Sequence, residues 1–573
     1  MTTPSTRKPG TTPKRGKRSA LTGPAALAAL AGVVSAAVVL AVAELAGAFF
    51  SSRATPLVAL GSTFIDFTPP WLKDFAIATF GTNDKAALFV GMGLTILVLA
   101  CVLGIVAYRK WILGAAGVLL MGAVIVASVV TRAGVSPLDA LPSLLGTLAG
   151  LLVLRFLIGK LWRLDETQSA PNHGAAAHGD ASHGGAAPET RPATTRRAFF
   201  TATGITAAAA AAAATGGRLL GAARSNVAAA RDALKLPAPA KPAPAVPAGV
   251  QSTTPGVTPW LTPNKDFYRI DTALSVPEVD VQSWELRVHG MVEQEVRLTF
   301  QDLLDAQLIE SHVSLTCVSN PVGGNLAGNA KWLGMPIRDV LKMARPTAGA
   351  DMVLSTSVDG FTASTPLEVL QDGRDAMLAI GMNGEALPLE HGYPVRMVVP
   401  GLYGFVSATK WVVDLEVTRF ADNKAYWTER GWSERGPIKT MARVEVPKSF
   451  AKVPAGKVAL GGTAWAQTRG ITKVEVQIDD GPWTAAVLAA EASVVTWRQW
   501  SYEWEAAPGP HYIKVRATDG TGELQTDQRA DPVPDGASGW QSIMVTVEEL
   551  TRSGGPRTID WQHAFEPACD LHR

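Results

Sequence analysis

Cys317 is the residue in this sequence whose type and setting best suit metal chemistry. It follows a stretch with strand character, His312–Thr316, and leads into a Gly/Asn-rich stretch, Val322–Asn329. Glycine tolerates dihedral angles that other residues avoid, so we expect a loop that lets backbone approach a bulky ligand closely. A thiol at the end of a strand and beside such a loop suits a soft-metal ligand. The alternative is a buried structural cysteine, because free cysteine is among the most buried residue types.

The other cysteines and the histidines limit what else the chain can bind. Cys101 lies in an apolar run and Cys569 near the C-terminal end, and three cysteines in all are too few for a disulfide framework. There is no CxxC or CxxCH motif, so neither a zinc ribbon nor a covalently attached c-type haem is encoded. A membrane b-type haem usually needs histidine ligands, and no histidine lies in an apolar run. We therefore predict no haem in this chain.

The N-terminal third of the chain, which precedes the part that carries this thiol, is apolar. The 573 residues are too many for one domain, and the net charge of +2 gives no reason to propose nucleic acid as a partner. A basic head, residues 1–20, precedes four predicted transmembrane helices within residues 21–160, and a fifth is predicted over 198–222. Each apolar run is near the roughly 20 residues that a helix needs to span a bilayer. The runs are Leu21–Phe50, Ala86–Tyr108, Trp111–Val130, Ala140–Ile158 and Ala198–Ala222.

The basic residues predict how these helices cross the membrane. Cationic loops stay cytoplasmic, and the basic head, the Arg109-Lys110 link and the segment 161–197 fall on one side. Five crossings then place everything after Ala222 outside the cytoplasm, so we expect a multi-pass cell-membrane protein with an extracytoplasmic remainder. Two charges lie within the runs, Arg155 near the cytoplasmic end of the fourth and Glu44 near the outer end of the first. Both are close enough to an interface to reach it.

Residues 161–197 read as a flexible cytoplasmic linker with two possible signals. His173, His178 and His183 could form a metal-binding tract, but a solvated linker is the favoured interpretation because nothing nearby would order it. The string Thr195–Phe200, TRRAFF, precedes an Ala-rich run and resembles a twin-arginine export signal. The alternative is a plain transmembrane helix that follows ordinary cytoplasmic arginines.

After the last apolar run the composition changes twice. Residues 223–258 form a Pro/Ala linker, and the Pro, Ala and Lys of Leu236–Pro255 predict a semi-rigid spacer that lifts a domain off the membrane. The next part has a mixed α+β pattern, with no GxGxxG after a strand to suggest a dinucleotide. Its predicted elements are strands over Trp284–Val288, Asp351–Ser357 and Pro394–Val399, a helix start at Thr299 and Asp302, and a helix over Pro336–Met343.

The last part reads as all-β. Alternating residues over Val474–Ile478 and Ile513–Ala517 are each followed by an Asp-Gly turn, and a final strand is predicted over Ile543–Val547. Short strands and such turns predict a small β-sandwich of immunoglobulin type. We place its start between Gly436 and Pro454.

Several motifs in register resemble the sulfite oxidase family of molybdopterin enzymes. They are Phe267-Tyr268-Arg269, the Cys317 loop, Met382-Asn383-Gly384, HGYPVR from His391 with VVPG from Val398, and Lys410-Trp411. The resemblance runs from about Trp260 to Val547. It implies a molybdopterin-binding oxidoreductase domain over 259–440 and an Ig-like dimerisation domain over 441–555, followed by a tail, 556–573. It also implies a possible homodimer.

The resemblance implies molybdenum held by one molybdopterin dithiolene, with Cys317 as the metal ligand. It also assigns Cys317 and Arg269 to catalysis, because Arg269 corresponds to a family arginine near the anion pocket. A soft thiolate suits a metal that cycles between oxidation states. The remaining implied cofactor-binding residues are Phe267, Tyr268, Arg269, Ile270, Asp271, Asp359, His391, Arg396, Ala408, Thr409 and Lys410. Surface pairs and turns remain the alternative roles for the charged ones.

Two departures from the family pattern bear on the substrate. The arginine expected after the metal cysteine is Val322, and the active-site tyrosine expected before M-N-G is Ile380. Hydrophobic replacements do not hold a sulfite dianion, since a buried unpaired charge is expensive. A neutral or mono-anionic small molecule, such as a sulfoxide, fits a less cationic pocket better.

The sequence therefore predicts a multi-domain chain: a transmembrane helical bundle, an α+β sulfite-oxidase-type domain and an all-β Ig-like sandwich. We expect a membrane-anchored, extracytoplasmic molybdenum-dependent oxidoreductase that transfers an oxygen atom to or from a small substrate. With no haem predicted, electrons must be exchanged with a separate carrier, a cytochrome or a quinone-linked partner. One alternative is a non-catalytic cell-surface binding or assembly protein on a relic of this fold. Another is a sensor or transporter centred on the bundle.

Overall fold

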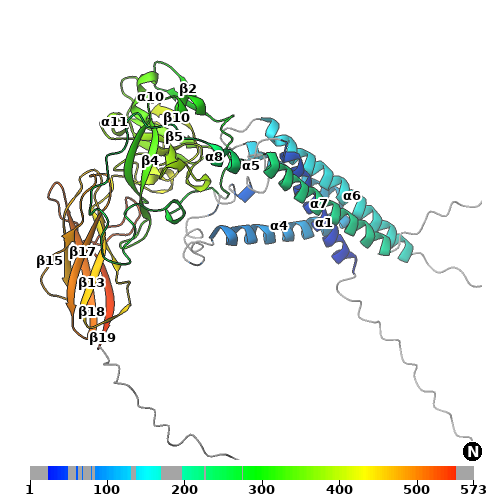
Figure 1. The fold of residues 1–573 in the computed structure, drawn as a ribbon. Coiled ribbons are helices and arrows are strands. Elements are labelled where there is room, and N and C mark those ends of the chain that lie inside the picture. The colour runs from blue at the N-terminus through cyan, green and yellow to red at the C-terminus, as the bar shows by residue number, and fades with distance from the viewer. Residues whose placement is uncertain are drawn as a thin grey trace, which may run out of the picture.

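The computed structural model describes residues 23–49, 84–130, 137–169, 196–224, 227–273 and 275–549, with a few isolated positions between 60 and 79. Three regions follow one another along the chain: a helical bundle, a mixed region of helices and sheets, and an all-β region (Figure 1). The predicted basic head, the histidine tract and the tail 556–573 lie outside the described residues, and so does Cys569.

The N-terminal region is helical, and five of its helices are long and apolar enough to cross a membrane by length and composition. The sequence predicted all five, although the fourth continues beyond Ile158 through polar residues. Helix α1 packs against α4, α6 and α7. Glycines allow these close crossings, because a side chain on Gly104 of α4 would collide with the carbonyl of Ala28 in α1. The helices are α1 (Pro24–Gly47), α4 (Asp84–Arg109), α5 (Trp111–Val130), α6 (Leu141–Ser169) and α7 (Arg196–Arg224).

A short helix, α8 (Val227–Ala233), follows α7 and packs directly on the mixed region. Val227 is buried in a hydrophobic cluster of that region. Arg231 donates hydrogen bonds from Nε to the carbonyl of Leu387 at 2.8 Å and from Nη2 to that of Ala386 at 2.7 Å. The first residue described after α7, Val227, is therefore already packed on the mixed region.

The segment predicted as a spacer is extended, but it does not stand free. Lys241 forms a parallel β-bridge with Ile309, at the start of the strand that leads to the cysteine. The amide of Glu310 donates to the carbonyl of Lys241 at 2.9 Å. Val250 is buried in the main core of the mixed region. The expectation of a spacer that lifts the domain off the membrane is therefore wrong, because its backbone and apolar side chains pair and pack with that domain.

The mixed region contains two sheets. One has the order β2-β1-β10-β5-β6, and the other has the order β3-β4-β7-β8 with β9 paired to β7. Within these two sheets all pairings are antiparallel except β1 with β10. The first sheet comprises β1 (Glu285–Gly290), β2 (Val296–Thr299), β5 (Met352–Ser357), β6 (Thr362–Pro366) and β10 (Val412–Thr418). The second comprises β3 (Ile309–Thr316), β4 (Ala327–Pro336), β7 (Met377–Met382), β8 (Glu385–Ala386) and β9 (Arg396–Val398).

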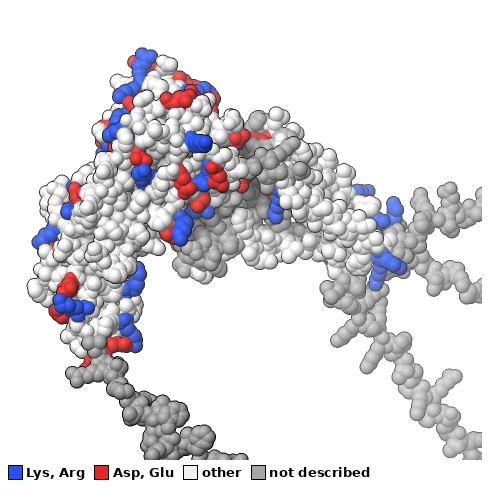
Figure 2. Space-filling model, viewed as in Figure 1, with Lys and Arg blue, Asp and Glu red and all other residues white. Residues whose placement is uncertain are grey.

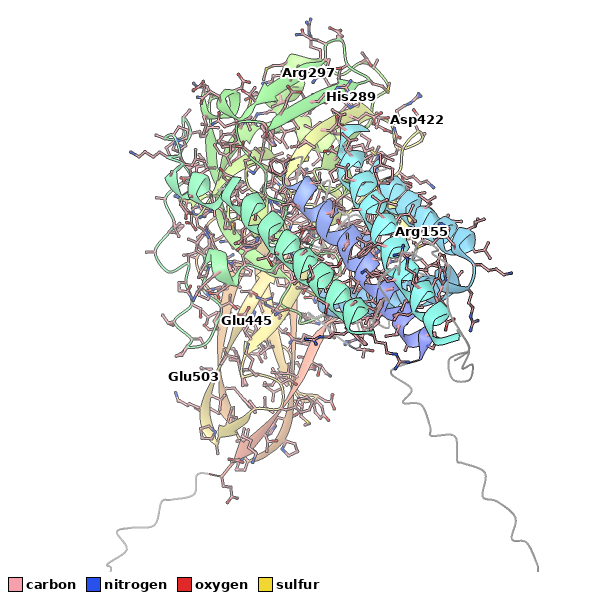
Figure 3. The ribbon with its side chains drawn as sticks, turned by 90° about the vertical axis from the view of Figure 1, so that its right-hand side faces the viewer. Arg155, His289, Arg297, Asp422, Glu445 and Glu503 are labelled. Atoms are coloured by element: carbon pink, nitrogen blue, oxygen red, sulfur yellow. The ribbon has the colours of Figure 1, made fainter. Side chains whose placement is uncertain are left out.

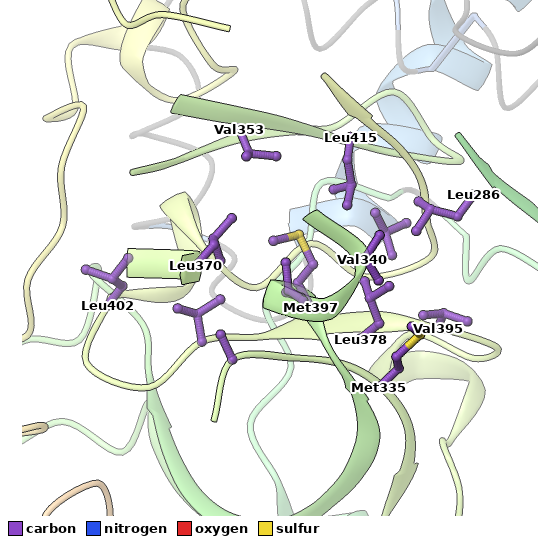
Figure 4. Close-up of a cluster of buried hydrophobic side chains, with 14 of the residues drawn as sticks. Leu286, Met335, Val340, Val353, Leu370, Leu378, Val395, Met397, Leu402 and Leu415 are labelled. Atoms are coloured by element: carbon purple, nitrogen blue, oxygen red, sulfur yellow. The ribbon is translucent and has the colours of Figure 1, made fainter. Parts of the chain in front are cut away.

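Helices cover and connect these sheets. A capping box between Thr299 and Asp302 starts α9, as the sequence predicted. Val340 of α10 lies among Leu378 of β7, Met397 of β9 and Leu415 of β10 in the buried core (Figure 4). The α-helices are α9 (Phe300–Leu304), α10 (Ile337–Ala344) and α11 (Leu367–Gln371). Single 3-10 turns occupy Pro137–Ala140, Asn264–Asp266, Leu389–His391, Gly404–Val406 and Thr428–Arg430.

Two predicted boundaries shift in the structure. The loop expected over Val322–Asn329 ends early, because Ala327 already pairs with Thr316 at the start of β4. The strand expected over Pro394–Val399 is shorter and comprises Arg396–Val398. The predicted strand before Cys317 is confirmed as part of β3.

The all-β region consists of two sheets that enclose one core. The first has the order β11-β13-β17-β16 and the second β12-β19-β18-β14-β15. Alternate residues such as Val474, Val515 and Val545 face a core that includes Trp500. The first sheet comprises β11 (Met441–Val446), β13 (Gly456–Trp465), β16 (Val487–Leu488) and β17 (Arg498–Ala506). The second comprises β12 (Lys452–Pro454), β14 (Ile471–Ile478), β15 (Thr484–Ala485), β18 (Gly509–Asp519) and β19 (Gln541–Glu548).

Candidate active site

Cys317 follows directly after β3, where the chain turns toward β4. Its amide donates to the carbonyl of Leu326 at 2.9 Å, which closes the loop between the two strands. The thiol is buried, and Sγ lies 2.9 Å from Oγ of Ser319. Burial raises the pKa of the Cys317 thiol, and the hydrogen bond with Ser319 offsets only part of that rise. The thiol is therefore protonated at neutral pH.

The loop that carries Cys317 is held from inside and from the all-β region. Oδ1 of Asn320 accepts a hydrogen bond from the amide of Leu326 at 2.9 Å. Nη1 of Arg443, in β11, donates to the carbonyl of Gly324 at 2.8 Å. Arg443 is itself fixed by Glu445, at 2.6 Å between Nη2 and Oε1, and both side chains are buried. Figure 3 labels Glu445 on its strand. The cysteine loop is thus supported by two regions of the chain.

Aromatic rings form a wall against β4, next to the strand that leads to Cys317. Phe267 stacks on Tyr268 with ring centroids 5.2 Å apart, and it meets the edges of Trp332 at 5.8 Å and His391 at 5.5 Å. Glycine is required opposite this ring, because a Cβ on Gly328 would lie 2.7 Å from Phe267. The wall joins the segment before β1 to the sheet that carries the cysteine.

Tyr268 interacts electrostatically with both the Cys317 thiol and the Arg396 guanidinium. Its pKa is raised by burial and further by Cys317, while Arg396 acts in the opposite direction. These influences place the Tyr268 hydroxyl within electrostatic range of both groups. The phenol stays protonated at physiological pH and can donate a hydrogen bond.

Arg396 is a buried cation whose hydrogen bonds go to backbone carbonyls. Its guanidinium donates to the carbonyl of His391 at 3.1 Å, that of Met397 at 3.4 Å and that of Ala408 at 3.5 Å. It also lies 5.1 Å from the centroid of the Trp332 ring. Burial lowers the pKa of Arg396 to about 10. Among the described residues no carboxylate pairs with it, and such a charge is costly unless an anion completes the site.

Lys410, the second predicted anchor, is paired within the protein. Nζ lies 2.6 Å from Oδ2 of Asp271 and donates to the carbonyl of Glu390 at 3.0 Å. Oδ2 of Asp271 also accepts from Nε of Arg269 at 2.8 Å. Burial lowers the pKa of Lys410 to about 8, although Asp271 pulls it upward. Asp271 thus brings two of the predicted cations together.

His391 is held as a neutral imidazole. Its Nε2 lies 3.1 Å from the carbonyl of Asn264, so this nitrogen carries the proton and Nδ1 is the acceptor. Burial, followed by the nearby charge of Arg396, lowers the pKa of His391 to about 4. Gly392 turns the chain with φ of 111°, and a Cβ there would lie 3.0 Å from Cβ of Arg396 and 3.1 Å from that of Lys410. Only glycine allows these functional residues to sit so close.

The remaining predicted residues occupy different places. Asp359 accepts hydrogen bonds from Thr272 at 3.2 Å and from Ser357, which brings it next to the Asp271 segment. Thr409 is fully buried and its Oγ1 lies 2.7 Å from Oγ of Ser355, so its side chain serves the fold. Ala408 contributes its carbonyl to Arg396. Ile270 is half exposed and adds no buried wall.

The two departures from the family pattern are apolar in the structure as well as in the sequence. Ile380 is fully buried in the main core, within β7, and Val322 packs against that core. Neither adds a charge or a hydroxyl near Cys317.

Sequence reasoning missed several residues that shape the site. Ser319 touches the thiol, and Arg443 supports its loop. Asn383 has φ of 52° and donates from Nδ2 to Oδ1 of Asn264 at 2.8 Å, which steadies the carbonyl that His391 meets. Asn383 sits in the quoted M-N-G motif, so that signal was available. No pattern around Arg443 in the sequence indicated its contact with the cysteine loop.

Comparison with known proteins decides the family. A family model described as "Oxidoreductase molybdopterin binding domain" matches residues 273–427. The "Uncharacterized oxidoreductase YuiH" of Bacillus subtilis (strain 168) is 31% identical over 157 residues, which are 27% of this chain and 76% of that protein. The chain belongs to the sulfite oxidase family of molybdopterin-dependent oxidoreductases.

Relatives in this family carry different names. "Sulfite oxidase" of Gallus gallus is 27% identical over 320 residues, 47% of this chain and 69% of that protein. "Nitrate reductase (NADH)" of Spinacia oleracea is 27% identical over 308 residues, 43% of this chain and 33% of that protein. Because both names occur among the relatives, family membership alone does not fix the substrate.

The residues of this site fit the family's cofactor, Mo-molybdopterin. The Cys317 thiol has the chemistry of a soft-metal ligand. Arg396, buried and without a carboxylate, offers a site for a phosphate group. The stacked rings of Phe267 and Tyr268 and the Nδ1 acceptor of His391 offer surface and hydrogen bonding to a planar heterocycle.

Proposed function

We propose that this chain is a membrane-anchored, extracytoplasmic molybdopterin-dependent oxidoreductase that transfers an oxygen atom on a small substrate of the sulfite or sulfoxide type. The observation that carries the proposal is a buried thiol, Cys317, near a buried guanidinium, Arg396, that has no carboxylate partner among the described residues. Tyr268 lies within electrostatic range of both groups. A structural cysteine in a relic fold would not need a buried cation without a counter-ion, since that charge only costs stability.

The chain's own residues bind and orient. Cys317 would ligate the metal as a thiolate, and Arg396 and Lys410 would hold the phosphate end of the cofactor. When bound, the molybdenum cofactor supplies two-electron redox chemistry with transfer of an oxygen atom. His391 stays neutral and can accept through Nδ1, while its Nε2–H donates to the carbonyl of Asn264. Tyr268 remains a protonated phenol that can donate to a substrate oxygen near the thiolate.

The substrate we propose is a neutral or mono-anionic molecule, with sulfoxides favoured over sulfite. Val322 and Ile380 stand where the family pattern has an arginine and a tyrosine. Arg269, the remaining family arginine of the anion pocket, is already paired with Asp271. A pocket with less free positive charge stabilises a dianion poorly.

The bundle would anchor the enzyme and set where electrons enter or leave. The five apolar helices support a multi-pass placement in the cell membrane, with the mixed and all-β regions outside the cytoplasm. Because α8 docks on the mixed region directly after α7, the catalytic region would lie against the membrane surface. Electrons would pass to or from a separate cytochrome or quinone-linked carrier. The Ig-like sandwich, residues 441–555, would serve a homodimer.

Elemental analysis and a substrate panel test this proposal together. Full-length protein purified in detergent should contain molybdenum near one atom per chain, and a reduced dye should be oxidised in the presence of sulfoxides. Sulfite with an oxidised dye forms the comparison arm. Absence of molybdenum from folded protein produced in cells that make the cofactor would contradict the function. Faster turnover with sulfite than with every sulfoxide would contradict only the substrate preference.

A further inference from the structure

One end of the helical bundle is strongly basic. Figure 2 shows Lys and Arg gathered at the end of the bundle away from the sheet-rich regions. The described cations at this end are Arg109, Lys110, Lys160, Arg163, Arg196 and Arg197, and Arg155 lies a little over one turn before Lys160 in α6. Asp165 is the one acidic side chain described there, and it accepts a hydrogen bond from the hydroxyl of Tyr108 at 3.0 Å. The local charge is therefore strongly positive.

Arg155 is the cation with a distinct setting in this group. Its guanidinium carbon lies 4.8 Å from the ring centroid of Trp111 and 5.2 Å from that of Trp162. Figure 3 labels Arg155 within the bundle. Trp111 is the first residue of α5, and Trp162 is two turns further along α6. The side chain therefore extends toward the end of the helix, where a membrane–water interface would lie. Indoles of this kind gather at such interfaces.

The surroundings of Arg155 hold the guanidinium but do not neutralise it. No carboxylate in the described part of the chain forms an ion pair with it, and its side chain is exposed. The indole of Trp162 is fixed by its own hydrogen bond, from Nε1 to the carbonyl of Tyr108 at 2.9 Å. Aromatic contacts occupy the faces of a guanidinium, while its N–H donors point outward in the plane and match the oxygens of a phosphate in a paired fashion.

We propose that Arg155, held between Trp111 and Trp162, binds the phosphate of an anionic phospholipid at the basic end of the bundle. The partner is a lipid of the phosphatidylglycerol class, whose headgroup lies at the interface and whose acyl chains run along the exposed apolar side chains of α5 and α6. Ile112, 80% exposed, and Phe156, 53% exposed, supply that apolar surface. Basic pockets between transmembrane helices favour such lipids. The site rests on the membrane placement proposed above and is independent of the molybdenum chemistry.

The test uses native mass spectrometry of the full-length protein in detergent. Phosphatidylglycerol and phosphatidylcholine with the same acyl chains are added separately, and the apparent Kd of each is measured. We expect tighter binding of phosphatidylglycerol, and Arg155→Ala should weaken it about fivefold, the effect of one basic residue near an anionic surface. Arg155→Lys should fall between the two, because it keeps the charge and loses the planar donors.

Arg218→Ala serves as the matched control. Arg218, at the other end of the bundle, is 70% exposed at its side chain and lies 3.8 Å from Glu44. Arg218→Ala should leave the phosphatidylglycerol affinity unchanged. Equal affinity for the two lipids, or an Arg155→Ala variant that binds like the wild type, overturns the lipid site. Molybdenum content measured on the same samples reports separately on the proposed function.

Discussion

Replacing Arg443 by methionine removes the contact between the all-β region and the cysteine loop. Arg443 and Glu445 are 6% and 5% exposed at their side chains, so the substitution leaves a buried carboxylate without its cation. Removing one partner of a buried pair costs about 3–5 kcal/mol. Glu445 keeps hydrogen bonds from the amide of Thr258 at 2.7 Å and from Oγ1 of Thr463 at 3.0 Å. We therefore expect the lower part of that range, about 3 kcal/mol.

The loss should be visible in thermal unfolding and in its pH dependence. If the mixed and all-β regions unfold together, Tm changes by about 2–4 °C per kcal/mol. Tm should therefore fall by about 6–12 °C. Burial raises the pKa of Glu445, but Arg443 and the hydrogen bond from Thr258 outweigh that effect and lower it below the usual 4.5. A carboxyl with a lowered folded-state pKa stabilises above its unfolded pKa and loses that contribution as pH falls. The wild type should therefore lose stability below about pH 4.5 more steeply than Arg443→Met.

A double variant separates stability from loop positioning. Arg443→Met with Glu445→Leu removes both buried charges, so Tm should rise above that of Arg443→Met, although the amide of Thr258 and Oγ1 of Thr463 lose their acceptor. The hydrogen bond to the carbonyl of Gly324 stays lost, so molybdenum content and turnover should remain reduced. Circular dichroism melts and elemental analysis of the full-length variants measure both effects. A double variant with wild-type molybdenum content and turnover would refute the role assigned to this contact.

Three further outcomes follow from the site and the segment before it. Arg396→Met should abolish cofactor loading while the cofactor-free chain becomes no less stable in urea, because an unpaired buried cation is removed. The pKa of Lys410 is lowered to about 8, so its charge is lost as pH rises through that value, and cofactor loading should weaken above it. Lys410→Arg should move this loss to higher pH in the same loading assay. Arg231→Ala removes two hydrogen bonds to the mixed region and should lower the free energy of unfolding by about 1.5–3 kcal/mol. Limited proteolysis should then cut faster before residue 258. An unchanged rate would contradict the docking of this segment.

Local signals in the sequence predicted the elements that carry the site. The strand before Cys317, the capping box at Thr299 and the apolar helices each depend on residues close together in the chain. The motif HGYPVR likewise marked Arg396, which is buried in the structure. Alternation, capping and apolar run length are sufficient in such cases, since the physical cause is local.

Contacts between distant residues were not predictable. Arg443 and Gly324 are 119 residues apart, and Arg231 and Leu387 are 156 apart. A Pro/Ala-rich composition predicts extended backbone, but it does not show that Lys241 pairs with β3. The pairing of Lys410 with Asp271 and the lack of such a partner for Arg396 also depend on the tertiary fold. Sequence reasoning treated both as equal anchors for that reason.

Molybdenum K-edge X-ray absorption of the loaded full-length protein tests the central claim most directly. The spectrum counts the sulfur atoms bound to the metal. Cys317→Ser should bind molybdenum with one sulfur fewer than the wild type, while Cys101→Ser, which changes the other cysteine among the described residues, should match the wild type. The same sulfur count in Cys317→Ser and the wild type would contradict the assignment of Cys317 as the metal ligand.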